Sequence, residues 1–118
     1  MPVNTSRVRL ANWVNFIVAL WLIVSPFILQ YADVPEATIN AIIVGALVAI
    51  LAAVWIFGVF GGATVGWAIA ILGVWQILSP WILGYSGETA AMVNAVIVGA
   101  IFVIFGAWSA IVSPRRAL

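Results

Sequence analysis

The stretch Trp75-Gln-Ile-Leu-Ser-Pro-Trp-Ile-Leu-Gly-Tyr85 decides how the chain is organised, because a near copy lies 54 residues earlier as Trp21-Leu-Ile-Val-Ser-Pro-Phe-Ile-Leu-Gln-Tyr31. Without a gap, residues 11–57 align with residues 65–111, and 18 of the 47 pairs are identical. The identical pairs include the two Ser-Pro dipeptides and two asparagines: Ser25-Pro26, Ser79-Pro80, Asn40 and Asn94. The chain is therefore an internal duplication.

The composition places the chain in a lipid bilayer. Of its 118 residues, 67% are hydrophobic and only 6% are charged, whereas a soluble domain has about a quarter charged residues. There is no His and no Cys, which excludes imidazole and thiolate chemistry. We therefore expect no catalytic residue, no metal ligand and no cofactor. The net charge of +1 is too small to indicate nucleic acid as a partner.

Four apolar runs of about 20 residues are each long enough for a helix of ~30 Å, which crosses the hydrocarbon core. The predicted fold is an all-α, integral membrane four-helix bundle of two tandem hairpins, related by a pseudo-twofold axis along the membrane normal. The predicted segments are a polar head at 1–9, a first repeat at 10–60, a tight turn at 61–63, a second repeat at 64–112 and a tail at 113–118. A basic head before an apolar run also fits a signal peptide, but this run pairs with an internal segment, which argues against cleavage.

Charges separate between the two ends of the predicted bundle. All four arginines lie near the termini, and all three acids lie in the two connections at the opposite end: Arg7, Arg9, Arg115, Arg116, Asp33, Glu36 and Glu88. The positive-inside rule predicts cytoplasmic termini. In the first connection, we expect Asp33 to cap the second helix, with Glu36 reaching back.

The Ser-Pro dipeptides and the two asparagines are expected to meet. Each proline removes one helical hydrogen bond and frees the carbonyl four residues earlier, at Leu22 and Gln76. Asn40 and Asn94 should lie at the same depth and bond the Ser-Pro region of their own hairpin. Two interpretations remain open, a structural bend pinned by the asparagine or a kink that shapes a binding site or gate.

The tryptophans also leave two interpretations open. Trp13, Trp55, Trp67 and Trp108 are expected at the arginine side and Trp81 at the loop side, as an aromatic belt. Trp21 and Trp75 lie deeper, where they either pack on the proline bend or, with Asn40 and Asn94, contact a ligand or lipid. Three polar residues within the apolar runs have no counterpart in the other repeat, and we expect them to contact lipid headgroups, water or another subunit: Asn12, Asn15 and Gln76.

Small residues recur at every fourth position of the second predicted helix, centred on Gly45. The fourth predicted helix nearly repeats this series around Gly99, with Val103 as the exception. Such stripes let helix backbones approach closely in lipid. The spacing does not decide whether the partner helix belongs to the same chain or to another copy.

The repeated pattern Trp-x3-Ser-Pro-[Trp/Phe]-x3-Tyr, followed by Asn-Ala-x-Ile-Val-Gly, resembles the SPW repeat family of prokaryotic membrane proteins. The pattern places Trp21, Ser25, Pro26, Tyr31, Asn40 and Gly45 in one copy and Trp75, Ser79, Pro80, Trp81, Tyr85, Asn94 and Gly99 in the other. The first copy carries Phe27 where the second has Trp81. The resemblance implies paired two-helix units in a prokaryotic plasma membrane and brings no catalytic activity.

Two functions are expected from these features. The first is a non-catalytic structural or accessory membrane protein that forms a homo-oligomer or joins a larger membrane complex. The alternative is a binding site or pathway between the repeats for a small neutral or lipophilic ligand, such as a lipid, quinone, pigment or solute. A central polar cavity would favour the ligand, and a packed core with an exposed small-residue face would favour assembly.

Overall fold

The computed structural model describes residues 2–57, 63–85 and 87–112, with the side chains of residues 2–7 left aside. These residues form four helices and no strand: α1 (Pro2–Ile28), α2 (Pro35–Ile56), α3 (Ala63–Ile82) and α4 (Thr89–Val112). Helix α1 already begins at Pro2, so most of the predicted polar head is helical. The predicted tight turn lies largely, and the predicted tail entirely, outside the described residues.

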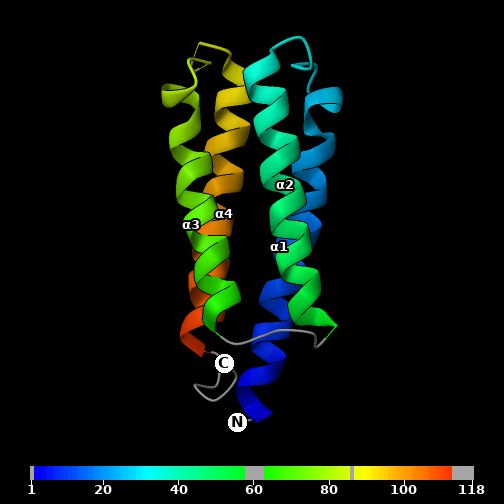
Figure 1. The fold of residues 1–118 in the computed structure, drawn as a ribbon, viewed down its shortest axis with the longest axis vertical. Helices are drawn as coiled ribbons and strands as arrows, with labels where there is room; N and C mark the ends of the chain where they lie inside the picture. The colour runs from blue at the N-terminus through cyan, green and yellow to red at the C-terminus, as the bar shows by residue number, and fades with distance from the viewer. Residues whose placement is uncertain (1, 58–62, 86, 113–118) are drawn as a thin grey trace.

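The helices form a four-membered bundle in which each helix packs on two neighbours: α1 on α2 and α4, and α3 on α2 and α4. The two hairpin connections lie at one end of the long axis and the termini at the other (Figure 1). Both repeats therefore run in the same direction, as two-span units must, and the second is not inverted relative to the first. The neighbour pattern maps onto itself when α1 is exchanged with α3 and α2 with α4, as a twofold along the bundle requires.

The bundle has the dimensions and surface of a multi-pass membrane protein. Its four candidate spans contain 21, 22, 20 and 24 residues, long and apolar enough to cross a bilayer. The outward side chains are large and apolar, among them Ile17, Phe27, Ile71, Ile104 and Ile111. Because such a surface is stable only against hydrocarbon, a lipid bilayer is the environment that it fits.

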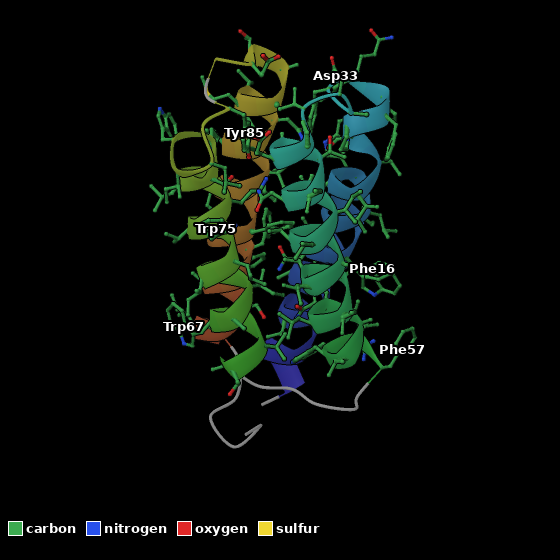
Figure 2. All side chains as sticks on the ribbon, turned by 45° about the horizontal axis from the view of Figure 1, so that its top comes forward. Phe16, Asp33, Phe57, Trp67, Trp75 and Tyr85 are labelled. Carbon is green, nitrogen blue, oxygen red and sulfur yellow. The ribbon has the colours of Figure 1, made fainter. Side chains whose placement is uncertain are left out.

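Tryptophan and charged side chains mark the two ends as predicted. Figure 2 places Trp67 at the end of the bundle that carries the termini and Asp33 at the opposite end. Trp13, Trp67 and Trp81 are exposed, which suits an aromatic belt at the two interfaces. At the termini end, the Arg9 guanidinium lies over the Trp55 ring, 5.9 Å from its centroid, and this contact joins α1 to α2.

The small-residue stripes pack inside each hairpin. A Cβ atom added to Gly99 would lie 2.7 Å from the Gly73 carbonyl oxygen, and one added to Gly106 would lie 2.8 Å from the Gly66 carbonyl oxygen. A Cβ atom on Gly45 would lie 2.9 Å from the Ala19 carbonyl oxygen on α1. The glycines therefore set the close approach of α3 to α4 and of α1 to α2, and their partner helices belong to the same chain.

The predicted cap of α2 is wrong by one residue. Pro35 occupies the first turn, and the N-cap is Val34, whose side chain makes no capping hydrogen bond. A proline suits the first helical position because its missing N–H has no intrahelical partner there. Since Pro35 begins the helix directly, Asp33 lies one position too early to cap it, and Asp33 is exposed.

Helices α1 and α3 end in the same way, shortly after their prolines. The Leu29 and Tyr31 amides donate to the Ser25 and Pro26 carbonyl oxygens at 2.8 and 2.9 Å. Between them Gln30 has a positive φ of 63°, and its counterpart Gly84 has a φ of 82°. This left-handed turn is a Schellman-type C-terminal cap, and it folds the tyrosine of each repeat back toward the Ser-Pro dipeptide of the same repeat.

Candidate functional site: two inter-repeat polar clusters

The serine before each proline replaces the hydrogen bond that the proline removes. Proline at position 26 has no N–H to donate to the Leu22 carbonyl. The Ser25 hydroxyl donates to that carbonyl oxygen at 2.8 Å, and the Ser79 hydroxyl donates to the Gln76 carbonyl oxygen at 2.8 Å. Both carbonyls freed by proline therefore have a hydrogen-bond partner, which is the adjacent serine.

Each tyrosine bonds the serine of its own repeat. The Tyr31 hydroxyl lies 2.9 Å from Ser25 Oγ, and the Tyr85 hydroxyl lies 2.7 Å from Ser79 Oγ. Because each serine hydrogen is already donated to a carbonyl, the tyrosine O–H is the donor in both pairs. Serine thus gains an acceptor role and remains open to one further donor.

Asn94 of α4 supplies that donor to the first repeat. Its Nδ2 donates to Ser25 Oγ at 3.0 Å and to the Tyr31 hydroxyl oxygen at 3.1 Å. The Trp21 indole Nε1 donates to Asn94 Oδ1 at 3.0 Å. We call these four residues (Trp21, Ser25, Tyr31 and Asn94) the Asn94 cluster.

Asn40 of α2 does the same for the second repeat. Its Nδ2 donates to Ser79 Oγ at 3.2 Å, and the Trp75 indole Nε1 donates to Asn40 Oδ1 at 2.8 Å. Here the second N–H is donated to Gln76 Oε1 at 3.0 Å. We call Asn40, Trp75, Gln76, Ser79 and Tyr85 the Asn40 cluster. Figure 2 shows Tyr85 toward the end of the bundle that carries the hairpin connections and Trp75 nearer the middle.

The prediction that each asparagine bonds its own hairpin is wrong. Asn94 bonds α1 and Asn40 bonds α3, so both carboxamides cross from one repeat to the other. The expected depth is correct, but each asparagine helix has two neighbours that carry a Ser-Pro dipeptide at that depth. Sequence periodicity does not distinguish these neighbours, so the packing of the two hairpins decides which Ser-Pro dipeptide each asparagine bonds.

The motif therefore has a physical meaning. Tryptophan at the first position, serine four residues later and tyrosine ten residues later all converge on one carboxamide of the other repeat. The residue after Ser-Pro is different: Phe27 and Trp81 are both exposed. No hydrogen bond of the Trp81 indole is found within the described residues, so exchanging tryptophan for Phe27 leaves the Asn94 cluster intact.

Burial affects the ionisation of Tyr85, which lies beyond the end of α3. Desolvation raises the pKa of its hydroxyl above the ordinary value, although the hydrogen bond with Ser79 acts in the opposite direction. The hydroxyl consequently stays protonated at neutral pH and remains a donor to Ser79 Oγ.

The carboxamides have little capacity left for a ligand. Both N–H groups of Asn40 and both of Asn94 are donated to protein oxygens, and each Oδ1 already accepts one indole N–H. Within the described residues no group of three or more His, Cys, Asp or Glu side chains is placed to hold a metal ion. The geometry is that of a structural lock, formed twice.

A shallow groove lies beside each cluster, on the seam between the two repeats. One has a volume of about 390 Å³ and is lined by Leu29, Thr89, Ala90, Val93, Asn94 and Ile97. The other has a volume of about 280 Å³ and is lined by Glu36, Ile39, Asn40, Ile43, Trp75 and Leu83. Five of the six lining positions correspond under the 54-residue offset, so the grooves are a symmetric pair.

The central core separates the clusters from the termini end. Apolar side chains that are almost fully buried fill this part of the bundle, including Leu22, Val48, Ile69, Val98 and Phe102. The three polar residues without a match in the other repeat, Asn12, Asn15 and Gln76, are buried inside the bundle. Packing in the bilayer core is therefore mostly apolar, with polar groups gathered at defined levels.

These features define a class: a multi-pass, all-helical membrane protein built from two tandem hairpins that exchange asparagine contacts. The model of the SPW repeat domain family matches residues 9–109, so the chain belongs to the SPW repeat family. Neither a curated protein nor a solved structure matches the chain significantly.

Proposed function

We propose that this protein is a small non-catalytic membrane component that acts by association, with copies of itself or within a larger complex. The observation that supports this most directly is the use of the motif residues: both carboxamides and both indoles are consumed in bonds that lock the repeats together. The absence of His and Cys from the sequence agrees with a role without turnover.

The association surface follows from what the bundle leaves outside. Since the glycine stripes pack within each hairpin, a partner helix meets the large apolar side chains instead. We place the protein in a prokaryotic plasma membrane with both termini in the cytoplasm. The support for this orientation is the arginines near the termini and the acids in the opposite connections.

Gentle extraction from the native membrane tests the association. We expect the protein in mild detergent to have a mass above that of one 12.6 kDa chain, or to co-purify with other membrane proteins. A lone monomer that brings down nothing and transports a solute in liposomes would refute this function.

Lipid binding in the paired grooves is a second candidate. The grooves are apolar, lie on the seams between repeats and face the bilayer, which suits an acyl chain. Native mass spectrometry should then detect bound phospholipid, and the groove-filling pair Ile43→Trp and Ile97→Trp should remove it. Ile104→Trp, which changes an exposed residue of α4 outside both grooves, is the control. Equal lipid retention in all three proteins would exclude the grooves.

A further inference from the structure

Asn12 and Asn15 form a polar group deep in the half of the bundle nearer the termini. Both side chains are fully buried. Asn12 Nδ2 donates to the Val8 carbonyl oxygen at 3.0 Å and to Ser109 Oγ of α4 at 3.3 Å. Within the described residues, Asn12 Oδ1 and both polar atoms of Asn15 have no hydrogen-bond partner.

Neither lipid nor the bulk aqueous phase supplies hydrogen-bond partners to these atoms. Asn15 lies seven residues into the span that begins at Val8, which is roughly 10 Å along the helix. An unpaired carboxamide in such a place is costly, because nothing in hydrocarbon replaces its hydrogen bonds to water. The corresponding residues of the second repeat are Gly66 and Ile69, which bring no polar side chain to this level.

We propose that Asn12 and Asn15 hold an internal water molecule. The two residues are three positions apart on one helix, so their side chains share a face. The unpartnered atoms are two carbonyl oxygens and one amide nitrogen. One water donates a hydrogen to each oxygen and accepts one from the nitrogen, which gives the three bonds typical of buried water.

The ligand is neutral because the site is neutral. It presents carboxamide donors and acceptors together, whereas an ion would need groups of one polarity. The next inward-facing residues along α1 are Ala19 and Leu22, which belong to the fully buried apolar core together with Phe102 of α4. The hydrated site therefore ends there on the side of the two clusters.

Water-edited solid-state NMR of the protein in lipid vesicles, labelled with ¹⁵N at asparagine, tests this site. We expect magnetisation to pass from water to the Asn15 side-chain amide. The matched internal controls are the Asn40 and Asn94 amides, whose N–H groups are donated to protein oxygens. Transfer to Asn15 no faster than to these controls would overturn the proposal, whether all three signals are dry or all three are wet.

The variant Asn15→Ile, which introduces the residue found at the equivalent position 69, identifies the signal by removing it. If that variant does not fold, sequential backbone assignment of the wild type identifies Asn15 instead. Because Asn4 and Asn12 are also labelled, the proposal is overturned if the signal that disappears in Asn15→Ile is one that receives no magnetisation from water in the wild type.

Discussion

The Trp21 indole Nε1 donates to Asn94 Oδ1 at 3.0 Å, although the two residues are 73 positions apart and belong to different repeats. The equivalent bond from Trp75 to Asn40 measures 2.8 Å. Each repeat thus supplies one asparagine carboxamide to the other repeat, together with the side chains that bond the carboxamide of the other repeat. The two repeats therefore stabilise each other through a reciprocal pair of asparagine contacts.

Replacing either asparagine by leucine should destabilise the protein. Asn94→Leu leaves the Trp21 indole and the Ser25 and Tyr31 hydroxyls without their shared partner, and the expected loss of stability is about 1 kcal/mol or somewhat more. Thermal unfolding in detergent measures it, with Thr64→Val at an exposed position of α3 as the control. Combining Asn94→Leu with Trp21→Phe should cost less than the sum of the two single changes, because they remove the same bond. Additive losses would show that the residues act independently.

Splitting the chain distinguishes contacts between repeats from contacts within them. Co-expressed fragments 1–60 and 61–118 should associate in the membrane and co-purify, because each half retains its own close-packed hairpin. Introducing Asn40→Leu and Asn94→Leu together should weaken that association while leaving each half helical. Undiminished co-purification of the doubly substituted halves would mean that apolar packing alone joins the repeats.

Enlarging the glycines of α3 and α4 should disrupt the hairpin itself. Gly99→Ala places a methyl group 2.7 Å from the Gly73 carbonyl oxygen, so the helices must separate, and we expect a loss of about 1–3 kcal/mol. Gly87→Ala in the second connection has no atom within 4 Å of the new methyl group and serves as the control. A change of oligomer mass in Gly99→Ala without any loss of thermal stability would contradict the intramolecular packing.

The turn after α1 should accept glycine with a gain in stability. Gln30 adopts a φ of 63°, a left-handed conformation that costs a residue with a Cβ atom about 1 kcal/mol. Gln30→Gly should therefore raise the unfolding temperature, whereas Gly84→Ala at the equivalent turn, with a φ of 82°, should lower it. A fall in the unfolding temperature of Gln30→Gly, or a rise in that of Gly84→Ala, would show that the left-handed turn does not control stability.

Stability should fall at strongly alkaline pH. Burial raises the pKa of the Tyr85 hydroxyl in the folded protein above its ordinary value of 10.0, which applies to the unfolded chain. The folded protein therefore binds the proton of the Tyr85 hydroxyl more tightly than the unfolded chain does. The contribution of this hydroxyl to the free energy of unfolding is complete below about pH 10 and is lost as the pH rises through the raised pKa. Unfolding followed against pH checks this effect, and Tyr85→Phe should reduce it.

Much of this architecture is predictable from the sequence, because lipid imposes a strict rule on length and polarity. The four spans, the common direction of the repeats and the depth of Asn40 and Asn94 all follow from apolar runs and the duplication. What the sequence does not reveal is lateral arrangement. Two neighbouring helices offer Asn94 the same dipeptide at the same depth, and a glycine stripe reads the same whether its partner helix is in the same chain or in another.

Local errors have local causes. Asp33 matches a capping pattern, but α2 begins at Pro35, one position later than that pattern requires. The bond from the Ser25 hydroxyl to the Leu22 carbonyl is not evident from the sequence, because a hydroxyl beside proline can equally well bond water. A signal for it does exist in the spacing, since serine three residues after Leu22 can reach the carbonyl that proline leaves free.

The exchange of asparagines between the repeats is the contact pattern of an isologous dimer, in which residue i meets residue j and residue j meets residue i. An ancestral gene that encoded one hairpin would have had this self-complementary surface before it was duplicated. Fusion of two copies made the contact between the hairpins intramolecular, so that each half no longer had to be complementary to an identical copy of itself. Gln76, opposite Leu22 in the alignment, and Asn15, opposite Ile69, are substitutions of the kind that such freedom permits. Evolution can therefore change one side of this molecule without changing the other, while the reciprocal asparagines hold the two sides together.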